Sequence, residues 1–189
     1  YVLLDISSSR SAEDARETIE AILTEAFEAG LVDDATIAES TAQEKSFWHM
    51  REAMSHAQKP EGGSIKHDIS VPVARIPDFI KEADQAVLDL IPGARIVSFG
   101  HMGDGNLHYN ISQPVGADKQ AFLDRWAEVT KRVHDIVRAY NGSISAEHGI
   151  GQLKRQELSE TKSPIALDLM RRIKKSFDPA GVMNPGKVI

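Results

Sequence analysis

The sequence has 189 residues, of which 41% are hydrophobic and 26% are charged. This composition is typical of a globular protein with an apolar core, and it excludes disordered and collagen-like chains. The formal net charge of -6 argues against a nucleic-acid partner, because a phosphate backbone attracts basic surfaces. The absence of cysteine excludes disulfides, thiolate zinc sites, iron–sulfur clusters and thiol nucleophiles. Any metal ion must therefore be bound by histidine and carboxylate.

The hydropathy and the start of the chain give two further expectations. No apolar run reaches the roughly 18 to 20 residues that cross a membrane, and no basic-then-apolar leader marks a signal peptide. We therefore expect a soluble protein. The chain begins at Tyr1 without an initiator methionine, so we expect it to be a piece of a longer polypeptide.

The first third of the chain contains two helical patterns. In the first, Glu13 and Asp14 lie where acidic residues stabilise a helix N-terminus, and Gly30 is a typical stop. In chain order we predict a strand at residues 1–7, a helix from 9–11 to 29, a short strand at 35–37 and a helix from 41 to 58. A loop rich in proline and glycine follows.

From residue 64 onward, apolar and polar residues alternate, which is typical of a strand. Ile65, His67 and Ile69 share one face of this strand, and Lys66 and Asp68 share the other. The further elements that we predict are helices at 77–90, 118–140 and 164–177 and strands at 94–101, 106–112 and 143–146.

The order of these elements from 64 to 146 is β-α-β-β-α-β. It predicts a ferredoxin-like α+β fold, in which helices pack mainly on one face of an antiparallel sheet. We expect His67 to be buried and His134 to lie on the solvent side of its helix. The apolar stripe of that helix, which we expect to face the core, consists of Phe122, Trp126, Val129, Val133, Ile136 and Tyr140.

Two histidines lie on either side of a predicted hairpin turn. Asp104-Gly105 is a strong signal for a two-residue turn, and a turn centred there places His101 directly opposite His108. Residues in that relation have Cβ atoms roughly 4.5–5.5 Å apart on one face, close enough for two imidazoles to share a metal ion. Asn110 and Phe99 belong to the same face.

A second polar pair, Glu147 and His148, follows the strand predicted at 143–146. Gly149 and Gly151 come next, so the backbone can approach a ligand closely there. With the two histidines, Glu147 would complete a three-ligand site that leaves coordination positions open for substrate. The spacing also permits a simpler arrangement, in which the histidines form a hydrogen-bonded pair in a half-buried sheet.

Three strings of the sequence occur in a characteristic order: SFGHMGDGNLHYNIS, SAEHGIGQLKR and FDPAGVMNPGKVI. Together they resemble the C-terminal part of FAD-linked 2-hydroxyacid dehydrogenases of the vanillyl-alcohol-oxidase superfamily. This group holds D-lactate dehydrogenases, glycolate oxidase subunits and D-2-hydroxyglutarate dehydrogenase. The resemblance covers essentially the whole chain, and the segment 48–72, with REAMS and IKHDISVP, is most similar to the D-2-hydroxyglutarate dehydrogenase branch.

The resemblance implies a role for each matching residue. It makes three residues the ligands of a divalent metal, zinc or another: His101, His108 and Glu147. It makes His148 the general base that removes the substrate hydroxyl proton. It assigns substrate binding to four residues: Arg51, Ser55, Lys66 and Asn110. It places Asn184, in the C-terminal tail, near the flavin. Arginine and lysine together favour a dicarboxylate substrate.

The activity that the resemblance implies is oxidation of a D-2-hydroxyacid, with D-2-hydroxyglutarate as the first choice, and hydride transfer to N5 of FAD. No glycine-rich phosphate turn is present in the sequence. The resemblance therefore implies that residues 1–189 are the substrate- and metal-binding domain and that an FAD-binding domain lies upstream. The implied electron acceptor is a quinone or an electron-transferring flavoprotein. The implied location is the cytoplasm, or the mitochondrial matrix in a eukaryote. The oligomeric state stays open, and a homodimer is one option.

Alternatives remain open at this stage. Within the same family, D-lactate or glycolate could be the substrate. The metal site alone also permits a metal-dependent hydrolase, although the sequence has no H-E-x-x-H helix. A non-catalytic module stabilised by a metal is the third possibility.

Overall fold

The computed structural model describes residues 1–189. They form two compact units, residues 1–58 and residues 59–189. The first unit contains two helices, α1 (Ala12–Glu28) and α2 (Thr41–Ala57). Each begins at a serine whose hydroxyl accepts a backbone N–H of the first turn: Ser11 from Asp14, and Ser40 from Gln43. Both predicted helices are thus confirmed to within a few residues.

The strands predicted at residues 1–7 and 35–37 are wrong. Both segments are irregular, and most of their residues are exposed. A β-rich stretch becomes a strand only beside another strand that satisfies its backbone N–H and C=O groups. The residues of the first unit provide none.

The second unit is built on a three-stranded antiparallel sheet in the order β1–β3–β2. Its strands are β1 (Ser64–Ser70), β2 (Arg95–His101) and β3 (Asn106–Ser112). Its helices are α3 (Ile76–Leu90), α4 (Lys119–Asp124), α5 (Trp126–Ala139), α6 (Arg155–Thr161) and α7 (Pro164–Phe177). Short 3₁₀ turns lie at Lys59–Glu61, Val73–Arg75 and Met102–Asp104.

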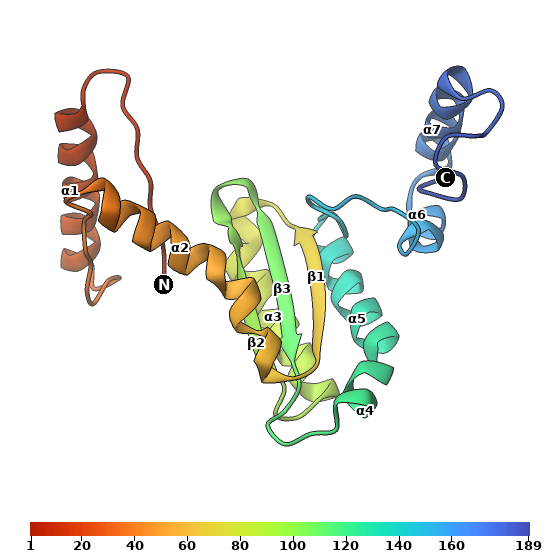
Figure 1. Cartoon of the computed structure of the whole chain (residues 1–189), viewed down its shortest axis with the longest axis horizontal. Coiled ribbons are helices and arrows are strands. Elements are labelled where there is room, and N and C mark those ends of the chain that lie inside the picture. Colours follow the sequence, from red (N-terminus) through yellow and green to blue (C-terminus); the bar gives the residue numbers. More distant parts are fainter. The chain divides into compact units, whose positions relative to one another are not determined.

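Alternation along the strands gives the sheet one apolar and one polar face. Ile65, Ile69 and Tyr109 are fully buried against α3 and α5, which run along that side of the sheet (Figure 1). Lys66 and Asp68 belong to the opposite face, as predicted. The fold is therefore α+β, with an antiparallel sheet and helices packed on one face.

The fourth predicted strand is reduced to a single bridge. Ser143 exchanges backbone hydrogen bonds with Ser70 at the end of β1, but residues 144–148 form no ladder. The N–H groups of Glu147 and His148 instead donate to the side chain of Asp68 on β1. This departure from a regular strand shapes the candidate site.

The long helix predicted at 118–140 is broken at Arg125, between α4 and α5. The Arg125 guanidinium donates a hydrogen bond to the Leu90 carbonyl oxygen at 2.6 Å, which joins the break to the end of α3. The break separates Phe122, on α4, from the rest of the predicted stripe, and Trp126, the first residue of α5, is 44% exposed instead of facing the core.

The expectation that His134 faces solvent is wrong, because α6, a helix that the sequence analysis did not predict, lies over that side of α5. His134 is 1% exposed, and its Nδ1 lies 2.8 Å from a carboxylate oxygen of Glu157 on α6. The expectation for His67 is confirmed: it is buried and bonded to the Tyr109 carbonyl oxygen and the Thr130 hydroxyl. None of the helices is both long enough and apolar enough to cross a membrane.

Candidate metal and substrate site

The hairpin between β2 and β3 sets the positions of two candidate metal ligands. His101 lies opposite Asn106, and His108 lies opposite Phe99, so the predicted direct pairing of the two histidines is wrong. The reason is the connection, which has four residues rather than two: the 3₁₀ turn Met102–Asp104 and Gly105. A shift of two residues keeps both histidines on one face, as diagonal neighbours.

Gly105 makes this tight connection possible. Its φ is +82°, and a Cβ atom at this position would lie 2.2 Å from the carbonyl oxygen of Val71. The same backbone approach lets the Val71 N–H donate to the Gly105 carbonyl oxygen at 3.1 Å. Only glycine combines the left-handed conformation with so close a neighbour.

His108 projects from the polar face of β3, between the ring of Phe99 and that of His148. The ring centroids lie 5.1 Å and 6.0 Å from that of His108. Its Nε2 atom lies 3.7 Å from Oε2 of Glu147. The sheet and the segment after residue 143 thus bring together an imidazole and a carboxylate that are far apart in the sequence.

Glu147 is also held by Asn106, whose side-chain amide donates a hydrogen bond to the other carboxylate oxygen, Oε1. Asn106 is 4% exposed, and its own Oδ1 is buried without a hydrogen-bond partner. Buried polar atoms normally have partners, so this oxygen points to a group that would complete the site. The sequence analysis did not single out Asn106, although its place beside the turn was visible.

Asp68 is the second site residue that the sequence analysis missed. Its Oδ2 accepts the backbone N–H groups of Glu147 and His148 at 3.0 and 2.8 Å. Nδ1 of His148 lies 3.6 Å from the same oxygen. Burial raises the pKa of the Asp68 carboxyl, but the two N–H donors and the charge of Lys154 outweigh it, and the pKa lies below its ordinary value. The alternation of β1 already placed Asp68 on this face.

A sequence model of the family described as FAD linked oxidases, C-terminal domain, matches residues 1–188. The chain belongs to this family.

Individual members of the family are similar over the whole of this C-terminal domain. A D-2-hydroxyglutarate dehydrogenase of Stutzerimonas stutzeri is 42% identical over 188 residues, which are 100% of this chain and 40% of that protein. Mitochondrial D-2-hydroxyglutarate dehydrogenases of Arabidopsis thaliana and Danio rerio are 39% and 34% identical over 189 residues. In these relatives, the domain spans 32% and 34% of the length. The predicted family resemblance is thus confirmed.

The donors of this C-terminal domain fit a divalent metal ion such as zinc. Two atoms bound to one tetrahedral zinc ion lie roughly 3.3 Å apart, since each bond is about 2.0–2.1 Å long. The 3.7 Å between His108 Nε2 and Glu147 Oε2 is close to that separation. Potential ligand atoms of Asp68, Glu147 and His148 also lie within 4.8 Å of one another. Imidazole and carboxylate donors without thiolate suit zinc or another divalent ion.

The other predicted site residues of the domain fall into two groups. Lys66 lies directly opposite Asn110 on the polar face of the sheet, so these two share the face with His108. Arg51 and Ser55 belong to α2 in the first unit. Their proximity to the metal ligands therefore stays a prediction.

Asn184 lies in the C-terminal tail and has a left-handed φ of 46°. The tail contacts the segment that follows His148: the Val188 N–H donates to the Gly151 carbonyl oxygen, and the Lys187 ammonium donates to the Gln152 side chain, both at 2.7 Å. The strands are all antiparallel, so the sheet contains no βαβ dinucleotide unit. The position of Asn184 near the flavin stays a prediction.

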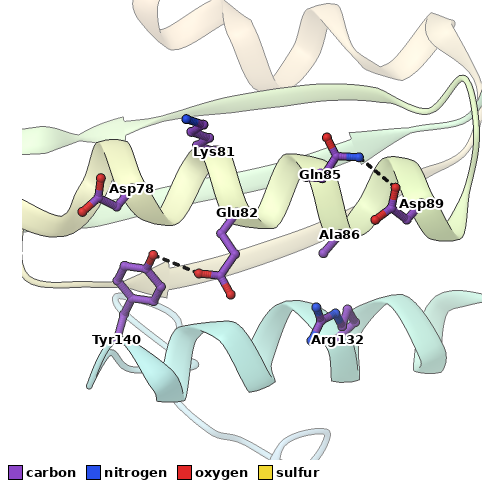
Figure 2. A pocket seen from close by; sticks show the side chains of 8 residues that line it. All are labelled: Asp78, Lys81, Glu82, Gln85, Ala86, Asp89, Arg132 and Tyr140. Atoms are coloured by element: carbon purple, nitrogen blue, oxygen red, sulfur yellow. Dashed lines mark hydrogen bonds between the residues drawn. The ribbon is translucent and has the colours of Figure 1, made fainter.

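A groove of about 520 Å³ lies elsewhere, between α3 and α5 (Figure 2). Three of its lining residues are acidic, among them Glu82, which accepts a hydrogen bond from the Tyr140 hydroxyl. These helices cover the apolar face of the sheet, whereas His108 lies on the polar face. The groove is therefore separate from the candidate metal site.

Proposed function

We propose that this chain is the substrate- and metal-binding C-terminal domain, residues 1–189, of an FAD-dependent enzyme that oxidises a D-2-hydroxyacid to the 2-oxoacid. D-2-hydroxyglutarate is the preferred substrate. The approach of His108 to Glu147, beside His148, is the observation that carries the proposal. The names of the similar proteins support it as well. FAD, bound mainly by an upstream domain, would supply the hydride acceptor at N5.

His101, His108 and Glu147 are the residues that would hold the metal ion. When bound, a divalent ion supplies a Lewis acid that makes the substrate hydroxyl more acidic. His101 ends β2 beside Asn106, and Asn106 in turn holds Glu147. The protein would thus hold these donors on the β2–β3 hairpin and on the segment that Asn106 contacts.

His148 is the residue that would take the hydroxyl proton. Its side chain is 67% exposed, so a substrate can reach it, and its ring lies beside that of His108. Imidazole exchanges protons near neutral pH, which suits a general base. Because Nδ1 faces Asp68, Nε2 is the nitrogen that is available for the substrate.

Four residues would bind the carboxylate groups of the substrate. Lys66 offers a positive charge and Asn110 a side-chain amide on the sheet face that carries His108. Arg51 adds a planar fork that matches a carboxylate, and Ser55 adds a hydroxyl one turn further along α2. Two cations favour a substrate with two carboxylates over lactate or glycolate.

The enzyme that contains this chain would pass its electrons to a quinone or an electron-transferring flavoprotein. The plant and fish relatives are described as mitochondrial. We infer the mitochondrial matrix for a eukaryotic source and the cytoplasm for a bacterial one.

The decisive experiment is flavin reduction by D-2-hydroxyglutarate in this enzyme, before and after verified metal removal. We expect reduction to be lost with the metal and restored by zinc. Undiminished reduction without metal would contradict the role of the metal, and His148→Ala with a normal rate would contradict the role of the base. Faster flavin reduction by D-lactate or glycolate would assign the enzyme to another branch of the family.

A further inference from the structure

We propose that Asp68 is a positioning residue, which holds Glu147 and His148 in the geometry that the site requires. Its role toward catalysis rests on the proposed function. Its role toward the backbone of Glu147 and His148 does not, because the hydrogen bonds that define it lie within the chain itself.

The segment that carries Glu147 and His148 needs an external anchor. It has no regular structure between the bridge at Ser143 and the start of α6. Gly149 and Gly151 both adopt positive φ, with nothing near the place of a Cβ atom. Within the segment, the Ser143 and Ser145 hydroxyls donate to the carbonyl oxygens of Ser145 and Gly149, but neither bond involves Glu147 or His148. Contacts with neighbouring elements therefore fix the two functional side chains.

Asp68, which lies opposite His108 on the polar face of the sheet, supplies that anchor. One carboxylate oxygen accepts two successive backbone N–H groups, those of Glu147 and His148, at 3.0 and 2.8 Å. The Asp68 carbonyl oxygen accepts a third, from Ala146, at 3.3 Å. Hydrogen bonds to a charged acceptor are stronger than neutral ones. β1 is hydrogen-bonded to β3 along its whole length, so Asp68 has a fixed place in the sheet. The segment that is bonded to Asp68 is therefore held in place as well.

The same carboxylate orients the imidazole of His148. Nδ1 lies 3.6 Å from Oδ2 of Asp68, within the range of an ion pair. Asp68 is 4% exposed, and its second oxygen, Oδ1, is buried without a partner. A buried carboxylate is costly unless it is well paired, so its retention in the strand calls for a specific use.

Lys154, which directly precedes α6, adds a second contact. Its ammonium donates a hydrogen bond to the Ile144 carbonyl oxygen at 2.6 Å. It also attracts the Asp68 carboxylate electrostatically. Lys154 therefore holds the segment at residue 144, and Asp68 is the residue that contacts Glu147 and His148 directly.

The test compares Asp68→Ala and Asp68→Asn with a matched control, Asp84→Asn, in the enzyme that contains this chain. Asp84 is also an aspartate that accepts a half-buried hydrogen bond, from the Tyr109 hydroxyl at 2.8 Å, but it lies on α3. Three quantities are measured: hydrogen–deuterium exchange of peptides covering 143–151, zinc affinity by chelator competition, and kcat and KM for D-2-hydroxyglutarate.

For Asp68→Ala we expect exchange in 143–151 to rise at least tenfold, and zinc affinity and kcat each to fall by about 10- to 100-fold, the usual effect of removing a residue that orients metal ligands. KM should change less than threefold. Asparagine keeps an acceptor oxygen without the charge, so Asp68→Asn should lie between alanine and the wild type. The control should resemble the wild type in all three quantities.

Wild-type exchange and zinc affinity in Asp68→Ala would overturn the proposal. If that variant does not fold, wild-type values in Asp68→Asn, with its charge removed, would overturn it. A wild-type enzyme that fails to oxidise any D-2-hydroxyacid would refute the proposed function instead, and exchange in 143–151 would still decide the role of Asp68.

Discussion

His108 on β3 and Glu147, which follows α5, bring Nε2 and Oε2 to 3.7 Å from each other. We predict that His108→Ala and Glu147→Gln each lower zinc affinity by about 10-fold or more, because each removes one donor from a small set. Chelator competition measures this affinity. His49→Ala, which removes a histidine from α2, serves as the control and should leave the affinity unchanged. Equal losses in all three variants would contradict the assignment.

A second prediction concerns the pH dependence of stability. Burial lowers the pKa of His67 to about 4, although the hydrogen bond to the Tyr109 carbonyl oxygen acts to raise it. An unfolded chain binds this proton with a pKa of about 6.5. Between these two pKa values, the unfolded state binds a proton that the folded state does not bind. The free energy of unfolding therefore falls as the pH drops from about 6.5 toward 4.

The size of this effect is measurable by urea unfolding. Between pH 7 and pH 5, the His67 contribution to the free energy of unfolding should fall by about 2 kcal/mol. His67→Phe removes the titrating group, so its loss over the same interval should be smaller by that amount. Identical losses in the two proteins would show that His67 titrates alike in both states.

A third prediction tests the contact between α5 and α6. Glu157→Ala removes the carboxylate that bonds to buried His134 and to Arg138. The free energy of unfolding should decrease by about 1–3 kcal/mol, because a buried ring nitrogen loses its partner. Glu160→Ala, on the exposed side of the same helix, should change it by less than about 0.5 kcal/mol. Similar effects of both substitutions on urea unfolding would refute this role.

A fourth prediction concerns the hairpin. Gly105→Ala should destabilise the protein by about 1–3 kcal/mol from the left-handed conformation alone, and the contact with Val71 adds to this. It should also weaken zinc binding, since the hairpin positions His101 and His108. Gly103→Ala, in the same loop, meets nothing within 4 Å and should be nearly neutral in both measurements. A neutral Gly105→Ala would contradict the tight approach.

Local patterns predicted most of the fold. The alternation at Ile65, His67 and Ile69 identified β1 and its buried face, and an acidic first turn with a glycine stop identified α1. What failed depended on contacts between distant segments. The burial of His134 requires α6, and the irregular segment at 1–7 lacks a neighbouring strand.

The same contrast between local patterns and distant contacts applies to the candidate site. Its chemistry was visible in His108, Glu147 and His148, and the structure brings these three together. The roles of Asp68 and Asn106 were not visible, because each depends on hydrogen bonds to residues beyond α5. A pattern within one strand reveals which face a residue occupies but not what lies over that face.

The pairing register between β2 and β3, rather than the length of their connection, keeps His101 and His108 on one side of the sheet. Side chains alternate along a strand, so a slip of one strand against the other by a single residue would turn one imidazole toward α3 and α5, into the apolar core. A residue added to the connection itself leaves the pairs His101–Asn106 and Phe99–His108 unchanged. We therefore expect this hairpin to tolerate a change of length within residues 102–105 better than an insertion within either strand.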